Sequence, residues 1–186
     1  MPIQTFTKTG LISSALILLG EKPTNTLVSQ RHGVTVGANM FETLYENELQ
    51  SNRWRFATMK VALSQLLDEP LNEWRFAYQL PPEMLLSIGV FPACLYDIYG
   101  DHLYTDASSV EMDIMFKPEV SEIPAYFALL LTYRLARDMA ESLTESGPKK
   151  DRWGREYNTQ RAVAMYADAQ GRPSRTIVRS PFTDVR

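Results

Sequence analysis

The stretch that decides the fold is SNRWRFATMKVALSQL, residues 51–66, which contains the word WRFA at Trp54–Ala57. The same word returns at Trp74–Ala77, so it holds two of the three tryptophans. The residues around the two copies do not match, and the chain therefore has no periodic repeat. The first copy stands where a helical pattern gives way to a strand pattern, and the second lies in a strand that runs into Pro81-Pro82. We interpret both words as structural corners, with Trp and Phe as core anchors.

The sequence before this stretch has helical periodicity and predicts two helices. The first spans about 8–19 and ends at Gly20, because glycine is favoured just past the end of a helix. The second spans about 27–50, where apolar residues recur every three and four positions and form one face. Gly33 and Gly37 each weaken this helix by about 1 kcal/mol relative to Ala, unless close packing requires a small residue. Residues 1–51 are thus predicted to be the N-terminal helices of a bundle.

Two further helices are predicted after residue 120. Pro124 suits the first turn of a helix, and the third helix runs from there until Gly147-Pro148 interrupts the pattern. Its apolar stripe repeats every four residues. The stripe consists of Phe127, Leu131, Leu135, Met139 and Leu143. The fourth helix spans about 149–170, so residues 121–170 are predicted to be the C-terminal helices of the bundle.

Between the two pairs of helices the hydrophobic period changes to two, which is typical of β-strands. A Gly100-Asp101 turn predicts a hairpin, and Val110–Phe116 alternates an apolar face with a solvent face that includes Met115. We therefore predict an α+β fold. It consists of an antiparallel bundle of four helices, an inserted β-rich subdomain at 52–120 and an extended C-terminal arm at 171–186.

Charge is distributed unevenly along the chain. Residues 1–146 hold ten basic and eighteen acidic residues, whereas residues 147–186 hold nine basic and four acidic ones. A basic tail behind an acidic body is typical of a segment that docks on an acidic partner or on a phosphate backbone. The arm at 171–186 has two prolines and few apolar residues, so it has no core of its own. It is either a frayed terminus or a segment that folds on a partner.

The composition excludes several kinds of site. Cys94 is the single cysteine, so no intramolecular disulfide forms; with His32 and His102 it provides too few ligands for the usual zinc sites. The sequence has no P-loop, no dinucleotide-binding glycine pattern and no nucleophile elbow. The apolar run Leu11–Gly20 is too short for a membrane-spanning helix, which needs about twenty residues. We predict no cofactor, no metal and no membrane contact.

A glycan hydrolase is one alternative function, because it would need a pair of carboxyl groups. The candidates are Glu111 with Asp113, which point the same way from one strand, and the acidic cluster Asp97–Asp106 near the hairpin. Both sets also have an ordinary structural explanation. The first is the solvent face of an amphipathic strand, and the second is typical of turn sequences.

A nucleic-acid-binding module is the other alternative. It would use the basic C-terminal quarter, or it would stack bases on Trp54 and Trp74 beside Arg53, Arg55 and Arg75. Phosphate neutralisation dominates nucleic-acid affinity, and the body of the chain is net acidic. We therefore favour core anchors as the role of the two tryptophans.

Four short motifs follow one another in a familiar order. SSALILLGEKP, residues 13–23, contains A-L-x-L-L-G-x-x-P, and Trp54–Ala57 is a W-x-F-A corner followed by KVALSQL. Trp74–Pro81 contains W-x-x-A-Y-x-L-P, and MYADAQ at Met165–Gln170 ends the last predicted helix. In this order the chain resembles the head-to-tail adaptor family of short-tailed bacteriophages, also called tail tubular protein A. The resemblance covers nearly the whole chain.

This resemblance implies a structural virion protein and no enzyme. Family members form a ring, commonly a dodecamer, beneath the portal of a filled head, and the ring continues the channel for DNA ejection. The helical part faces the portal and neighbouring subunits, and the β-rich part faces the next tail component, the nozzle. An acidic body suits a channel that must not hold DNA. The implied location is the virion tail, after assembly in the host cytoplasm.

Two sets of partner-binding residues follow from the resemblance together with the charge pattern. The arm is predicted to dock on the portal ring through basic and apolar side chains. These are Arg172, Arg175, Ile177, Val178, Arg179 and Phe182. The hairpin tip is predicted to contact the tail nozzle. Its residues are Tyr99, Gly100, Asp101, His102, Leu103 and Tyr104.

Overall fold

The computed structural model describes residues 5–68, 70–71, 73–144 and 147–171. Within these ranges the helices are α1 (Lys8–Leu19), α2 (His32–Gln50), α3 (Ala125–Thr144) and α4 (Gly147–Gln170), and a 3-10 helix, η1, spans Arg55–Ala57. The strands are β1 (Thr58–Ala62), β2 (Ser64–Gln65), β3 (Phe76–Gln79), β4 (Met84–Phe91), β5 (Tyr96–Tyr99), β6 (His102–Thr105) and β7 (Glu111–Phe116). They lie between α2 and α3 in the chain and form two antiparallel sheets, which confirms the α+β class.

Helix α1 has the bounds that the sequence predicts. The side-chain oxygen of Thr7 accepts a hydrogen bond from the backbone N–H of Gly10 at 3.0 Å and so caps the first turn. At the other end Gly20 has φ 85°, the left-handed conformation that glycine adopts without steric cost.

Helix α2 begins at His32, and the prediction that it starts near residue 27 is wrong. The residues before it make local hydrogen bonds through their hydroxyl groups. Thr26 Oγ1 accepts from the Val28 N–H, and Ser29 Oγ accepts from the Arg31 N–H, each at 3.2 Å. Such bonds compete with helical ones, so the regular helix starts only after them.

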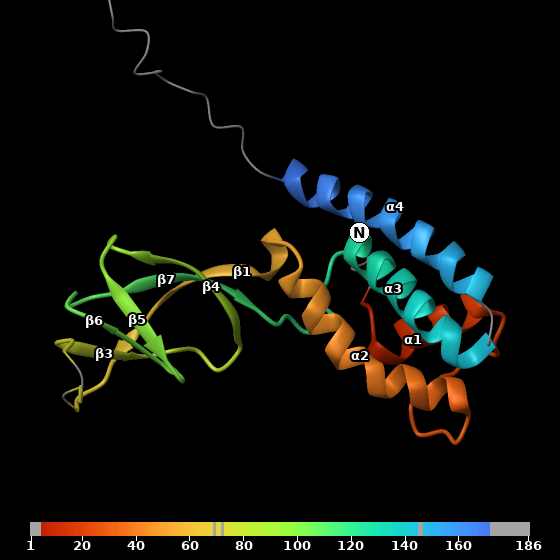
Figure 1. Ribbon diagram of the computed structural model, residues 1–186, viewed down its shortest axis with the longest axis horizontal. Helices are drawn as coiled ribbons and strands as arrows, with labels where there is room; N and C mark the ends of the chain where they lie inside the picture. Colours follow the sequence, from red (N-terminus) through yellow and green to blue (C-terminus); the bar gives the residue numbers. More distant parts are fainter. Residues whose placement is uncertain (1–4, 69, 72, 145–146, 172–186) are drawn as a thin grey trace, which may run out of the picture.

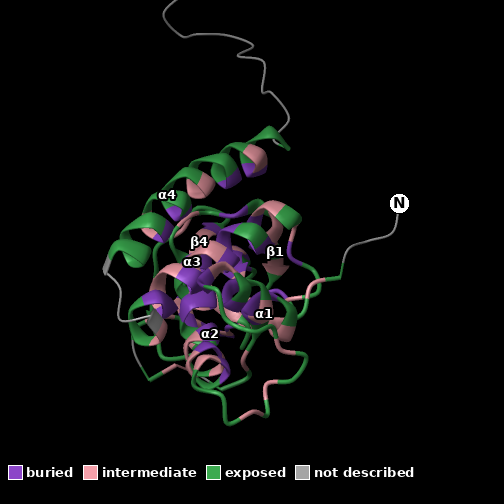
Figure 2. Cartoon of the chain, turned by 90° about the vertical axis from the view of Figure 1, so that its right-hand side faces the viewer, coloured by how far each residue is buried: buried purple, intermediate pink, exposed green. Residues whose placement is uncertain are grey.

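Helix α3 lies at the centre of the helical part and packs against the three other helices. The prediction of its apolar stripe is confirmed, because four of its five members are fully buried and Leu143 is half-buried. Figure 2 shows that the buried side of α4 is turned toward α3 and that its exposed side is turned outward. A single core therefore joins all four helices.

Two glycines of α2 allow this close packing. A Cβ atom on Gly37 would lie 2.8 Å from Ile12 Cγ2 and 3.1 Å from Met139 Cε, and one on Gly33 would lie 2.8 Å from Leu16 Cδ2. The small residues are thus required at the contacts of α2 with α1 and α3. This requirement outweighs the weaker helix propensity of glycine.

We expect Gly37→Ala to lower the free energy of unfolding by about 1–2 kcal/mol, although Ala is the better helix former. The matched control is Gly154→Ala in α4, where the nearest atom to the new Cβ is Arg137 Cδ at 3.9 Å. That change should raise the free energy of unfolding by about 0.5–1 kcal/mol. Urea denaturation followed by circular dichroism measures both. An equal gain in the two variants would show that the α1–α2 contact tolerates a methyl group.

The two sheets share a second, smaller core. The first sheet has the strand order β1-β7-β4, and the second has the order β2-β3-β6-β5. Met112 and Ile114 of β7 are fully buried in this core together with Tyr78 and Leu103 of the second sheet. The alternation that the sequence predicts for one face of β7 is therefore confirmed.

The other face of β7 differs from the prediction at one residue. Met115 was expected on the solvent face with Glu111 and Asp113, but it is buried in the core of the helical part. The helices cover this face at the end of β7 that lies nearest to them. Period-two alternation assigns Met115 to the correct face of the strand but does not say that the face is covered there.

Polar contacts also join the strands to α2 at this end. Lys117 directly follows β7, and its ammonium group lies 2.8 Å from a carboxylate oxygen of Glu42 and 2.8 Å from one of Glu46. The hydrogen bond from Lys117 holds the pKa of the Glu42 carboxyl below its usual value. Inside the core, Tyr45 Oη donates to the Pro118 carbonyl at 2.8 Å. Figure 1 shows the result, with the helices at one end of an elongated molecule and the strands at the other.

Candidate interaction surface

The first WRFA word forms the corner between α2 and β1. Trp54 is fully buried, its indole N–H donates to the Glu48 carbonyl at 2.9 Å, and its ring packs edge-on against Phe127 with centroids 5.1 Å apart. Phe56 packs against the same Phe127 ring at 4.9 Å. The prediction that these two rings are core anchors is confirmed. Trp54 presents no face on which a nucleic-acid base could stack.

The last turn of α4 is fixed to the same corner by Asp168. This carboxylate is buried and accepts hydrogen bonds from the backbone N–H of Arg55, at 3.1 and 3.2 Å, and from Tyr126 Oη at 2.8 Å. Burial, followed by the bond to Asp168, raises the pKa of the Tyr126 hydroxyl. The place where the chain leaves α4 is therefore set by a specific contact. Asp168 belongs to the MYADAQ motif, but its structural role could not be derived from the motif.

A buried ion pair joins α2, α3 and α4. Glu48 is 0% exposed, and one of its carboxylate oxygens accepts from Arg134 at 2.6 Å and from Tyr157 Oη at 2.9 Å. Its other oxygen lies 4.0 Å from Arg161 Nε. Burial, followed by the charge of Glu48, raises the pKa of the Tyr157 hydroxyl. Sequence analysis missed this group, although Glu48 stands three residues after Tyr45 on the apolar face of α2.

The second WRFA word lies in the strand-rich part and has a different role. Trp74 is half-buried, and its indole N–H donates to Asp97 at 3.1 Å. Strand β3 begins at Phe76, and Ala77 and Tyr78 are buried in the small core. The Trp74 side chain thus links the segment before β3 to β5 through Asp97. The two identical words therefore occupy unrelated environments.

The predicted hairpin is present in β5 and β6. Gly100 has φ 62° at the turn, as expected for a tight hairpin. The rings of Tyr99 and Tyr104 lie 5.7 Å apart, and His102 lies 6.2 Å from Tyr104. The hydrogen bond from Gln79, followed by its own backbone N–H, lowers the pKa of the Asp101 carboxyl. The hairpin therefore gathers three aromatic rings beside a carboxylate.

One residue of the predicted nozzle-binding set does not lie on this surface. Leu103 is 0% exposed and packs in the small core. Strand alternation places it on the face opposite to His102 and Tyr104, so the pattern itself could have shown this. The five other residues of the set are exposed or half-buried.

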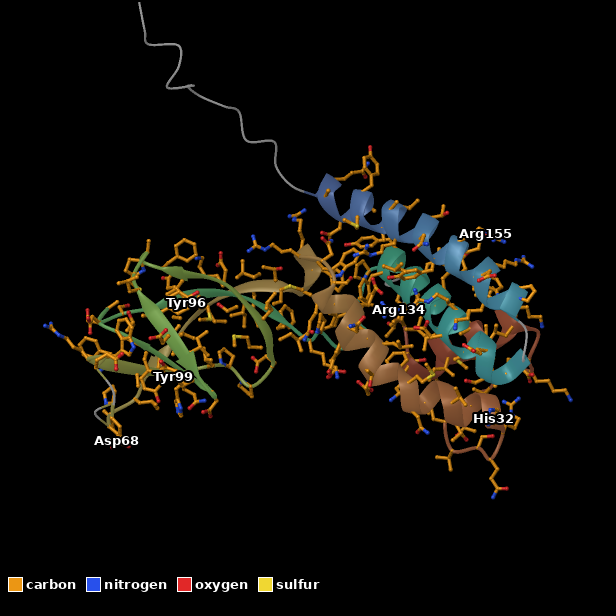
Figure 3. The ribbon with its side chains drawn as sticks, viewed as in Figure 1. His32, Asp68, Tyr96, Tyr99, Arg134 and Arg155 are labelled. Atoms are coloured by element: carbon orange, nitrogen blue, oxygen red, sulfur yellow. The ribbon has the colours of Figure 1, made fainter. Side chains whose placement is uncertain are left out.

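Exposed apolar side chains also occur along β5, on both faces of the strand. Leu95 is 82% exposed, and Tyr96, Ile98 and Tyr99 also expose much of their side chains. Figure 3 shows Tyr96 and Tyr99 on the strand-rich end, far from Arg134 in the helical part. The turn follows from the sequence pattern, but the exposure of Tyr96, Ile98 and Tyr99 along β5 was not predicted.

The acidic residues near the hairpin are engaged in the second sheet. Asp97 accepts from Trp74, Asp101 accepts from Gln79, and Asp106 accepts from the Arg75 backbone N–H. Among the residues that the structure describes, no group of three metal-ligating side chains is arranged to hold a metal ion. These contacts support the interpretation as turn chemistry.

The carboxylates of Glu111 and Asp113 lie on the accessible face of β7. Both are close to Lys60 of β1, at 3.9 and 3.0 Å, and the Lys60 ammonium also lies 3.7 Å from the centroid of the Phe91 ring. A general acid of a glycan hydrolase normally needs an apolar pocket around its carboxyl group. Glu111 and Asp113 instead form cross-strand ion pairs with Lys60 on a solvated face.

The residues predicted to dock on the portal lie at 172–186 and so lie outside the described residues. The described chain ends at Gly171, directly after α4. Near this end α4 exposes three apolar side chains. They are Val163, Met165 and Tyr166.

None of the helices in the described part of the chain is both long and apolar enough to cross a lipid bilayer. Comparison with models of known protein families and with curated proteins gives no match for this chain.

Proposed function

We propose that this chain is a head-to-tail adaptor, a structural protein of a phage virion that joins the portal ring to the tail nozzle and continues the DNA channel. In this proposal residues 52–120 form an inserted β-rich subdomain that faces the tail, and the helices form a bundle that faces the portal. The subunits assemble into a ring, which the resemblance implies to be a dodecamer. The protein carries no catalytic site.

The observation that carries the proposal is the separation of two different surfaces, one on the strand-rich part and one on the helical part. Within the described residues two α-helices precede the strands and two follow them, which agrees with the order that the resemblance implies. The strand-rich end exposes the aromatic hairpin, and the helical part exposes apolar side chains of α4, whose last turn is fixed to the α2–β1 corner by Asp168. A connector needs separate sites for two successive partners, and this arrangement supports that requirement.

Exposed apolar residues support association with other proteins. They occur along β5, where they include Tyr99, and near the end of α4, where they are Val163, Met165 and Tyr166. Apolar groups that gather on a surface mark protein contacts more often than scattered ones do. We assign the hairpin to the nozzle and the outer side of α4 to a neighbouring subunit of the ring.

Deleting residues 172–186 should abolish attachment to the portal ring and leave the fold intact. The deleted segment lies after every helix and strand of the described chain, so no described core contact is lost. Light scattering after size-exclusion chromatography, with the cognate portal ring present, measures the attachment. The full chain should join the portal ring at a fixed stoichiometry, whereas the shortened chain should elute alone with an unchanged circular dichroism spectrum.

A full-length control separates charge from length. Replacing Arg172, Arg175 and Arg179 together with Glu should prevent attachment, and replacing them with Lys should retain part of it. If the shortened chain binds the portal as well as the full chain does, the arm is not the docking segment. If the full chain ignores the portal at every salt concentration, the adaptor function is wrong, and assays of glycan cleavage and DNA binding come next.

A further inference from the structure

Within the described residues four strands lie at the edges of the two sheets, and three of them have features that discourage the addition of another strand. Strand β4 has register irregularities near Leu86 and Ser87, and β1 carries the exposed Lys60. Strand β2 consists only of Ser64 and Gln65. Bulges, edge lysines and very short strands are the usual protections of a sheet edge. The fourth edge strand, β5, has no Lys and no Pro, and all four of its residues pair with β6 in regular register.

The hairpin turn determines which backbone groups of β5 face away from β6. Hydrogen-bonded and non-hydrogen-bonded pairs alternate along an antiparallel ladder, and a two-residue turn closes on a hydrogen-bonded pair, here Tyr99 with His102. The N–H and C=O groups of Ile98 and Tyr96 therefore point outward. Among the described residues no strand pairs with this side of β5.

The small core is incompletely covered along the same edge. Tyr96 and Ile98 lie opposite Thr105 and Leu103, and residues directly opposite each other in a ladder share one face of the sheet. Thr105 and Leu103 are 0% exposed, whereas Tyr96 and Ile98 remain 38% and 37% exposed. A further strand with apolar side chains on this face would complete the core.

Charge determines which kind of strand can be added. Residues 64–106 contain seven Asp or Glu and a single Lys or Arg, which is Arg75. Asp97 lies on β5 itself, and the side chain of Asp101 at the turn is 71% exposed. Like charges on adjacent strands are destabilising, so the β5 strand of a second copy is a poor occupant. An acidic surface also repels nucleic acids and anionic lipids.

We propose that the outer edge of β5 accepts a strand from a partner protein, and that this strand has apolar residues on its core face and Lys or Arg on its other face. Strand addition obtains affinity from backbone hydrogen bonds and specificity from alternate side chains. The apolar residues cover Tyr96 and Ile98. The basic residues lie on the face of Asp97 and Tyr99, where a cation meets both a carboxylate and an aromatic ring.

The identity of the partner rests on the proposed function, in which the β5–β6 hairpin contacts the tail nozzle. The added strand is then a segment of the nozzle with this alternation of apolar and basic residues. The chemistry of the edge does not depend on the adaptor function, so a synthetic strand tests it without any tail component. Attachment to the portal ring tests the adaptor function separately.

The synthetic strand is the peptide Lys-Val-Lys-Ile-Lys-Val-Lys, added to the full chain and followed by hydrogen exchange in NMR spectra. Without peptide, the amides of Tyr96 and Ile98 should exchange faster than those of Asp97 and Tyr99, which are bonded to β6. Saturating peptide should slow the exchange of the Tyr96 and Ile98 amides by about tenfold or more, because an added strand protects them. The acidic counterpart, with Glu in place of each Lys, should leave both rates unchanged.

A proline variant tests the outward donor of the edge. Ile98→Pro removes an N–H that makes no bond to β6, and proline is tolerated where the N–H of an edge strand faces solvent. It should weaken peptide binding by about tenfold or more, because the added strand loses a backbone partner. The matched control is Ile98→Val, which keeps the N–H and a β-branched side chain and should bind the peptide as the unaltered chain does. Circular dichroism verifies that both variants are folded.

A charge variant leaves the backbone of β5 unaltered and so does not depend on the proline variant. Asp97→Asn combined with Asp101→Asn keeps an oxygen acceptor for the Trp74 indole N–H but removes both negative charges. It should weaken binding of the basic peptide and reduce the dependence of that binding on salt. Unchanged exchange of the Tyr96 and Ile98 amides in the presence of the basic peptide, or equal protection by the acidic one, would overturn the proposal.

Discussion

Replacing Glu48 with Gln should lower the free energy of unfolding by about 3 kcal/mol, because the Arg134 guanidinium, whose side chain is only 14% exposed, loses its closest counter-charge and keeps only Asp138 at 3.2 Å. Glu48 accepts from Arg134 at 2.6 Å and from Tyr157 at 2.9 Å, and it has no exposed surface. Gln has nearly the same shape, so the loss measures charge and hydrogen bonding without opening a large cavity. Urea denaturation gives the free energy of unfolding of each variant.

The matched control is Glu46→Gln, two residues away on the same helix. Glu46 pairs with Lys117 at 2.8 Å, but its side chain is 44% exposed, so this change should cost less than about 1 kcal/mol. A double variant with Glu48→Met and Arg134→Met should recover much of the stability lost in Glu48→Gln, since it removes both charges together. Equal effects of the two single changes would mean that the Glu48 site is open to water.

The position of this ion pair explains why sequence analysis could not find it. Helical periodicity predicts which face of α2 and α3 is buried, and those faces are confirmed by Phe41 and Leu135. Glu48 contacts Arg134 and Tyr157 only because α2, α3 and α4 pack with one particular axial offset. Periodicity within a helix contains no information about its axial position relative to another helix.

In the strand-rich part, too, local sequence predicts some features and misses others. The alternation in β7 and the turn at Gly100 follow from local sequence, and both are confirmed. That Met115 is covered by the helices, and that β5 lies at a sheet edge, depends on the order of strands in the two sheets. Strand order is a long-range property, which is why the burial of one residue and the exposure of side chains along β5 were not predicted.

Trp54→Ala should lower the free energy of unfolding by about 4 kcal/mol, the second large effect expected for this chain. The change empties a fully buried site, removes the hydrogen bond to the Glu48 carbonyl and removes ring contacts with Phe56 and Phe127. The site lies between α2, η1 and the α3 core, so the surrounding backbone has little freedom to collapse into the cavity. Thermal and urea denaturation should report the same loss.

Trp74→Ala supplies a control with the same four-letter word around it. Trp74 is half-buried and bonds to Asp97 at the strand-rich end, so its loss should cost about 1–2 kcal/mol. The two variants share the residue type, the WRFA word and the removed volume, and they differ in flanking sequence, local backbone and tertiary environment. A larger loss of unfolding free energy in Trp54→Ala than in Trp74→Ala therefore measures the contribution of the α2–β1 corner to stability. If the two losses were equal, the α2–β1 corner would contribute no more to the free energy of unfolding than a half-buried contact does.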